Sequence, residues 1–137
     1  MTEPILYETD GPIARITFNR PDAFNAMDPG LRAGFRESIL KVHKDDAVRA
    51  IIVSGNGRGF CSGTDLKEGL SRHTGMFLEQ EYRPILAMIA TSPKIWISQV
   101  HGSAAGIGAA VAMNCDMMVM AESANIYMAF AALNLIP

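Results

Sequence analysis

Two glycine-rich turns, each between a predicted buried strand and a predicted helix, constrain this chain more than any other feature. The first reads Gly-Phe-Cys-Ser-Gly-Thr-Asp-Leu over Gly59–Leu66 and follows the apolar run Ala50–Ser54. The second reads Gly-Ser-Ala-Ala-Gly-Ile-Gly over Gly102–Gly108 and follows Lys94–Val100. Strands that enter helices through tight turns predict an α/β fold in which helices pack against a sheet.

The backbone amides of these turns suggest a chemical role. N–H groups at the start of a helix have no acceptor within the helix. When N–H groups from two such turns point at one position, they stabilise negative charge on an oxygen. The leading hypothesis is an oxyanion hole for an acyl compound. The structural alternative stays open, and is the commoner one for glycines alone, because glycine also serves simply to allow tight turns and close packing.

Periodicity and turn residues predict the other elements. Asp28 and Pro29 are typical of a helix start, as N-cap and first helical residue. Pro84 predicts a kink or a split in the helix that contains it. The expected order is a hairpin of Ile5–Thr9 and Ile13–Phe18, a helix from Pro29 to about His43, a strand at Val48–Val53, a short helix capped by Asp65, a helix at Phe77–Ala90, a strand at Ile95–Val100, a helix at Gly106–Asn114, and strands at Asp116–Met120 and Asn125–Met128.

Composition excludes several classes of function. The 137 residues suffice for one domain with a core, and the net charge of −2 comes without a Lys/Arg cluster, so no nucleic-acid partner is expected. The longest apolar stretch, Ser103–Val111, is too short to span a membrane. The N-terminus lacks the pattern of a signal peptide, so Cys61 and Cys115 are interpreted as reduced thiols of a cytoplasmic protein.

Metal and nucleotide-phosphate sites are not expected either. His43, His73 and His101 are far apart in the sequence, and no Cys-x-x-Cys pair occurs. His101, at the end of a predicted strand, is more typical of a hydrogen-bonded structural histidine than of a catalytic one. Neither glycine-rich turn has the spacing of a dinucleotide fingerprint, and there is no Walker phosphate loop.

Taken together, the motifs resemble those of the crotonase superfamily, the enoyl-CoA hydratases and isomerases. The similarity lies in Asn19-Arg20-Pro21 with Asn25-Ala26-Met27, in the Gly59–Leu66 turn, and in the segment from Val100 through Gly108 to Asn114-Cys115-Asp116. It runs from about residue 10 to the end of the chain. Family members are roughly twice as long, so the single domain, residues 1–137, resembles the N-terminal half of a crotonase-like spiral of ββα units.

The resemblance implies a site for an acyl-CoA. The N–H groups of Thr64 and Ile107 would hold the thioester oxygen and stabilise its enolate. Coenzyme A is then part of the substrate and no separate cofactor is implied, and a homotrimer or a dimer of trimers is expected. Lys67 is a candidate phosphate contact, although an exposed lysine is more often simply solvated. The residues implied to contact the substrate or its CoA are Ala23, Asn25, Ala26, Ser62, Gly63, Thr64, Asp65, Leu66, Lys67 and Gly106.

The chain departs from the family at its acid–base residues. Hydratases of the family carry two glutamates, which here correspond to Ala110 and Phe130. From Gly102 to the end the carboxylates are Asp116 and Glu122, both expected to face water. Hydration needs one group to activate water and another to protonate carbon, so an isomerase is favoured over a hydratase, and glutamate at both positions is the expected route to hydratase activity.

The end of the chain carries two further expectations. Some relatives use an aspartate directly after a Leu/Val-Pro pair, and Ile136-Pro137 corresponds to that pair, so the base is expected just beyond it. The apolar residues Ala129–Ile136 are expected to form an interface. A non-catalytic CoA-ester binder or assembly subunit is the alternative to an enzyme. An apolar pocket is expected from Phe130, Met128, Met113 and Met117, although Met at such density is more often core.

Overall fold

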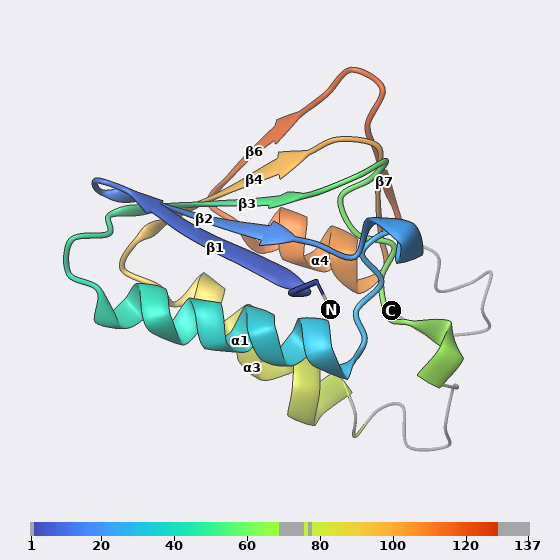
Figure 1. Cartoon of the computed structure of the whole chain (residues 1–137), viewed down its shortest axis with the longest axis horizontal. Coiled ribbons are helices and arrows are strands. Elements are labelled where there is room, and N and C mark those ends of the chain that lie inside the picture. The colour runs from blue at the N-terminus through green and yellow to red at the C-terminus, as the bar shows by residue number, and fades with distance from the viewer. Residues whose placement is uncertain (1, 69–75, 77, 129–137) are drawn as a thin grey trace.

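The predicted N-terminal hairpin forms one edge of a five-stranded sheet in the order β1-β2-β3-β4-β6 (Figure 1). The computed structural model describes residues 2–68, 76 and 78–128. Strand β1 runs antiparallel to β2, and the pairs β2–β3, β3–β4 and β4–β6 are parallel. The strands are β1 (Ile5–Asp10), β2 (Ile13–Phe18), β3 (Ala50–Gly55), β4 (Ile95–Val100) and β6 (Met117–Met120).

The helices of the described part lie on one side of this sheet (Figure 1). They are α1 (Pro29–Lys44), α3 (Arg83–Ala90) and α4 (Ile107–Asn114), with short turns η1 (Pro21–Ala23), η2 (Leu66–Glu68) and η3 (Leu78–Tyr82). The predicted cap of α1 is confirmed, since the Asp28 carboxylate accepts a hydrogen bond of 2.8 Å from the Leu31 amide. At the other end, the Lys94 ammonium donates to the carbonyl oxygens of Val42 and Asp45, as the negative end of a helix favours.

The helix expected before β4 is split near Pro84. A single π-helical stretch, η3, leads into α3, whose first turn contains Pro84. Proline has no N–H and is tolerated only in the first turn of a helix, which accounts for a new start at Arg83. Phe77, the expected first residue, lies outside the described residues.

Alternation along the central strands builds the core. Side chains from these strands are fully buried toward the helices at Ala14, Ile16, Phe18, Ile51, Val53, Trp96 and Ser98. The Phe18 ring meets Phe35 of α1 edge-on at 5.0 Å between centroids and Phe60 at 5.4 Å. The strand expected at Val48–Val53 begins two residues later, because Val48 is buried in the preceding turn, where its amide donates to the Asp45 carbonyl.

A second, smaller layer contains the strand expected at Asn125–Met128 and a strand at Ser103–Ala105 that was not expected. Strands β5 (Ser103–Ala105) and β7 (Asn125–Tyr127) pair in parallel. Parallel bridges between Cys61 and Ala104, and between Met27 and Thr64, extend this layer sideways. The segments Cys61–Thr64 and Ser103–Ala105 are short and rich in Gly, Ala and Ser, so neither strand propensity nor alternation predicts them. The layer joins both glycine-rich turns.

Candidate active site

The two glycine-rich turns run side by side in the second layer. The Cys61 amide donates to the Ser103 carbonyl (3.3 Å) and the Ala105 amide to the Cys61 carbonyl (2.9 Å). Contact continues at the glycines that follow: a Cβ added to Gly63 would lie 3.0 Å from the Ala105 carbonyl oxygen. Because Gly63 precedes Thr64 and Gly106 precedes Ile107, the predicted donor residues follow directly on backbone segments that touch.

The hydrogen bonds around Thr64 determine which way its amide points. The Gly63 carbonyl accepts from the Met27 amide at 2.7 Å. The C=O and the following N–H of a trans peptide point in opposite directions. The Thr64 N–H is therefore directed away from Met27, toward the side where the layer pairs with residues 103–105. Among the backbone hydrogen bonds of the described turns, loops and caps, none is donated by the Thr64 N–H.

The Ile107 amide lies at the start of α4. The Gly106 carbonyl accepts from the Ala110 amide inside the helix at 3.0 Å, so the Ile107 N–H points out of the helix end, where the helix dipole favours negative charge. Gly106 has a φ of 54° and a ψ of −125°, a conformation that essentially only glycine adopts. Isoleucine at position 107 leaves this backbone arrangement intact.

Asn25 is buried and its side chain is fully engaged within the protein. Its amide nitrogen lies 2.9–3.1 Å from the carbonyl oxygens of Asn56, Gly59 and Phe60. Its amide oxygen accepts from the Arg20 amide at 2.8 Å, and its own carbonyl accepts from the Cys61 thiol. The Asn25 side chain therefore holds its loop against the first glycine-rich turn, and the predicted contact of this loop with CoA stays a prediction.

The other predicted CoA-contact residues range from exposed to buried, and Ala23, Thr64, Asp65 and Gly106 are half-buried. Ser62, Leu66 and Lys67 are exposed, whereas Ala26 and Gly63 are buried. The two predicted CoA segments do lie together, since the Ser62 amide donates to the Phe24 carbonyl at 3.0 Å. A surface pocket of about 460 Å³ lies against the first of them, lined by Thr2, Pro4, Asn19, Arg20, Pro21, Asp22, Ala23, Asp28 and Gly30.

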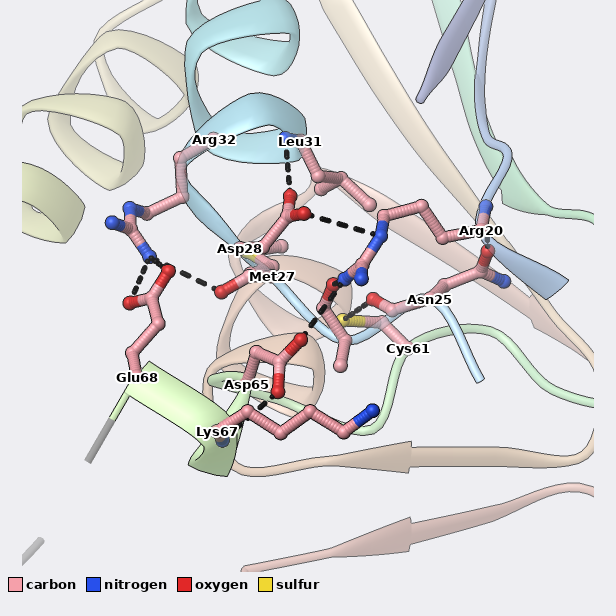
Figure 2. Close-up of polar contacts among 11 residues, drawn as sticks. Arg20, Asn25, Met27, Asp28, Leu31, Arg32, Cys61, Asp65, Lys67 and Glu68 are labelled. Carbon is pink, nitrogen blue, oxygen red and sulfur yellow. Dashed lines mark hydrogen bonds and ion pairs between the residues drawn. The ribbon is translucent and has the colours of Figure 1, made fainter. Parts of the chain in front are cut away.

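Arg20, which sequence reasoning did not single out beyond its motif, ties these segments together (Figure 2). Its guanidinium lies 3.3 Å from both the Asp28 and the Asp65 carboxylates. The Lys67 amide donates to the other Asp65 oxygen at 3.0 Å, which confirms Asp65 as the cap of η2. The Lys67 amide first, and Arg20 next, lower the pKa of Asp65 below its ordinary value.

Arg32 and Tyr82 form a second buried group beside the first turn. Arg32 of α1 is 6% exposed, donates to the Met27 carbonyl (3.1 Å) and pairs with Glu68 at 3.0 Å (Figure 2). Its guanidinium lies 5.6 Å from the centre of the Tyr82 ring. Burial acts to lower the pKa of Arg32, but the hydrogen bonds to Glu68 and Tyr82 outweigh it and the pKa is raised. The Thr64 hydroxyl donates to the Tyr82 phenol oxygen at 3.1 Å.

Comparison with known proteins identifies the family. The model of the family described as enoyl-CoA hydratase/isomerase matches residues 8–137. The chain belongs to the enoyl-CoA hydratase/isomerase family.

Individual relatives support this membership. The chain is 37% identical to a 1,2-epoxyphenylacetyl-CoA isomerase from Escherichia coli over 100% of its length and 55% of the relative's. It is 35% identical to a probable enoyl-CoA hydratase from Rhodobacter capsulatus, over 97% of this chain and 52% of that one. The chain therefore spans about half the length of the curated relatives it matches.

Solved structures agree with the crotonase fold. A putative enoyl-CoA hydratase/isomerase (crotonase) from Legionella pneumophila superposes with a TM-score of 0.91 at 29% identity, covering 100% of this chain and 55% of that one. An enoyl-CoA hydratase from Mycobacterium avium gives a TM-score of 0.88 at 26% identity, with the same coverage. The fold is that of the N-terminal half of a crotonase.

The structure places only part of the residues that the resemblance assigned to acid–base chemistry. Ala110 lies in α4, three residues after Ile107, and its methyl group cannot move a proton. Asp116 and Glu122 are exposed, as expected, and the Asp116 carboxylate accepts from the Trp96 amide at 2.8 Å. Phe130 and the Ile136-Pro137 pair lie outside the described residues.

Two further sequence predictions meet different outcomes. His101 makes a hydrogen bond of the kind expected for a structural histidine, since its Nε2 lies 2.7 Å from the Gly57 carbonyl oxygen. The expected apolar pocket stays a prediction, since Phe130 lies outside the described residues, but Met113, Met117 and Met128 are 50%, 57% and 44% exposed and so are not core residues. They lie on the surface, where no described segment covers them.

Other chemistry receives little support. Among residues 2–68, 76 and 78–128 no cluster of three or more His, Cys, Asp or Glu side chains suits a metal ion. The expectation that the protein binds no metal stays a prediction, because the remaining residues are not described. Cys61 and Cys115 are free, and burial raises the pKa of each thiol to about 12. No described helix combines the length and the apolar character needed to cross a membrane.

Proposed function

We propose that this protein acts on an acyl-CoA by stabilising the enolate of its thioester between the N–H groups of Thr64 and Ile107. The observation that carries the proposal is the contact between Gly63 and the Ala105–Gly106 backbone, directly before the two donors. Preorganised amides cost no rearrangement when charge develops on the oxygen. The predicted CoA segments around Ala23 and Ser62, with Lys67 beside them, are the proposed cradle for the nucleotide part.

The proposed reaction is isomerisation of a double bond or a ring rather than hydration. Ala110 occupies a position where the hydratases of the resemblance carry a glutamate, and hydration needs two positioned acid–base groups. A relative with 37% identity is named an isomerase, which agrees with this choice. The base that moves the proton is proposed to lie outside residues 2–68, 76 and 78–128. The protein is further proposed to be cytoplasmic and to need no cofactor besides the CoA of its substrate.

Two measurements on the same protein preparation, each with its own substrate, test the proposal. The protein is incubated with a β,γ-enoyl-CoA in D₂O, and NMR follows both deuterium entry at the α-carbon and migration of the double bond, while mass spectrometry follows addition of water to an α,β-enoyl-CoA. We expect α-exchange and migration without appreciable hydration. Brisk hydration would overturn the choice of isomerase. Tight binding without exchange would favour the non-catalytic CoA-ester binder.

A further inference from the structure

We propose that Tyr82, held by Arg32, is a positioning residue that sets the direction of the Thr64 amide. The inference rests on the proposed oxyanion hole and adds to it residues from α1, η3 and η2. It also gives the threonine side chain a purpose, since an oxyanion donor at position 64 needs only its backbone N–H.

The peptide before Thr64 is one that the backbone alone leaves loosely determined. Gly63 has a φ of 100°, and glycine has the widest conformational range of any residue. The Met27 amide fixes the Gly63 carbonyl from one side. A second restraint on the same peptide comes from the Thr64 side chain, because a β-branched side chain held at its oxygen has its χ1 angle fixed.

The hydroxyl of Thr64 is held by a rigid partner. It donates to the phenol oxygen of Tyr82 at 3.1 Å, and Tyr82 is 2% exposed. Burial raises the pKa of the Tyr82 phenol above its ordinary value. The phenol therefore stays neutral near pH 7, and it accepts this bond as an oxygen that keeps its own proton.

Arg32 in turn restrains the Tyr82 ring. Its guanidinium lies 5.6 Å from the ring centre, within the range of a cation–π contact. Glu68 lies 3.0 Å from one guanidinium nitrogen and Glu81 lies 3.6 Å from another. Glu68 belongs to η2, four residues after Thr64, and Glu81 directly precedes Tyr82. Arg32 therefore links the segment that follows Thr64 to the segment that carries Tyr82.

A misdirected oxyanion donor weakens binding of the enolate more than binding of the ground-state thioester. Loss of the Thr64–Tyr82 hydrogen bond should therefore lower kcat by about five- to tenfold, the fold-change that corresponds to one ordinary hydrogen bond, and leave KM nearly unchanged. It should also reduce the polarisation of a bound thioester carbonyl.

The test uses Tyr82→Phe, Thr64→Val and the double variant, with Tyr7→Phe as a matched control. The Tyr7 hydroxyl is buried in β1 without a hydrogen-bond partner among the described atoms, so its removal should leave kcat unchanged. Both single variants should lower kcat, Tyr82→Phe at least as much as Thr64→Val because it also removes the hydrogen bond between the phenol and Arg32. The double variant should be no worse than Tyr82→Phe, because both single variants remove the Thr64–Tyr82 bond. Additive losses, or unchanged kcat in both single variants, would overturn the proposal.

A spectroscopic measurement separates this proposal from the proposed function. Bound cinnamoyl-CoA should absorb at longer wavelength than free cinnamoyl-CoA when its carbonyl is polarised. A shift in the unmodified protein that shrinks in Tyr82→Phe, but not in Tyr7→Phe, is the expected result. An equal shift in both variants overturns the positioning role alone, whereas no shift in the unmodified protein overturns the oxyanion hole itself.

Arg32 is tested by Arg32→Lys against Arg36→Lys, an exposed neighbour on α1. Lysine keeps the positive charge, but its ammonium group lacks the planar set of N–H donors with which the guanidinium contacts several partners at once. Arg32→Lys should reduce the cinnamoyl-CoA shift and kcat, and Arg36→Lys should change neither. Far-UV circular dichroism and thermal melts of both variants show whether the fold is kept. A folded Arg32→Lys variant with an undiminished shift would contradict the role given to Arg32.

Discussion

At the scale of single residues, Asn25 makes an unusually large number of the hydrogen bonds that hold the candidate site together. It stands in a left-handed conformation, with a φ of 55°, which asparagine tolerates better than most residues. Its side chain then donates into a loop more than thirty positions away in the sequence. One buried amide thus joins the loop before α1 to the turn that leads to Thr64.

Asn25→Ala should destabilise the protein strongly. The substitution leaves the buried carbonyls of Gly59 and Phe60 without this donor, and each unsatisfied buried group costs about 1–3 kcal/mol. We expect a loss of about 2–4 kcal/mol in urea unfolding. Asn56→Ala is the control, because the Asn56 side chain bonds the Asn19 side chain at an exposed position. This variant should cost less than about 1 kcal/mol. Equal effects of the two variants would contradict this account.

Asp65 predicts a dependence of stability on pH. Its pKa is lowered in the folded protein, chiefly by the Lys67 amide and then by Arg20. The unfolded chain therefore takes up this proton first, and the stabilisation is present above about pH 4 and disappears as the pH falls through the folded pKa. Asp65→Asn should melt at a lower temperature than the parent at pH 7, and this difference should shrink as the pH falls below about 4. A constant difference at every pH, or a similar profile for exposed Asp46→Asn, would refute it.

Residue roles were predictable where a local motif defines them. Asp28 and Asp65 were recognised as caps because capping depends on neighbours in the sequence. Arg32 and Tyr82 were not recognised, because their partners are distant: Arg32 pairs with Glu68 and Tyr82 with Thr64. For Arg32 one signal existed, since it stands beside the apolar stripe of Leu31, Phe35 and Ile39.

At the scale of elements, the placement of α4 depends on the absence of a side chain at Gly108. A Cβ there would lie 2.4 Å from the Cys61 carbonyl oxygen and 2.8 Å from its sulfur. The first turn of α4 therefore packs directly on the strand-like segment that ends at Thr64. This close approach is what brings Ile107 to the same edge as Thr64.

Gly108→Ala should push α4 away from Cys61 and cost about 1–3 kcal/mol through overpacking. Gly30→Ala in α1 is a matched control, because a Cβ there meets nothing closer than 3.5 Å. It should stabilise the protein by up to about 1 kcal/mol, since alanine favours a helix over glycine. Thermal melts of the two variants should move in opposite directions. A Gly108→Ala protein as stable as the parent would contradict the tight packing of α4.

Elements with strong periodicity or punctuation were predicted closely, such as α1, β2 and β4. Strands β5 and β7 were less accessible: Ser103–Ala105 was interpreted as part of a turn, and Asn125–Tyr127 only as a further strand without a partner. Such strands exist because neighbouring segments supply hydrogen bonds, and a single sequence does not show which segments become neighbours.

At the scale of the whole molecule, β6 forms an apolar edge of the main sheet. Met117 and Val119 are 57% and 59% exposed, and Ile95 of the neighbouring β4 is 52% exposed. Contiguous exposed apolar surface normally marks an interface. The homo-oligomer expected from the resemblance remains a prediction, and this edge is the surface on which it can be tested.

We expect the protein to self-associate in sedimentation velocity, with a coefficient that rises with concentration. A Val119→Lys variant should shift the distribution toward the monomer, because a charge on an edge strand opposes edge-to-edge pairing. Glu8→Lys on β1, at the opposite edge of the sheet, is the control and should change little. A monomer at every concentration would show that this edge is not a self-association surface.

The side-by-side order of the two layers has a consequence for how the protein opens. From β2 onward, each strand of the main sheet is followed by a segment of the second layer: Met27 after β2, Cys61–Thr64 after β3, β5 after β4 and β7 after β6. Each pass of the chain therefore touches mainly the passes before and after it, as in a solenoid. Cooperative units of this kind fray from their ends. Amide hydrogen exchange should be slower in β2, β3 and β4, which have a strand on each side, than in β6 and β7, which each pair with one strand among the described residues. The Ile107 side of the proposed oxyanion hole, which follows β5, would then be less protected than the Thr64 side.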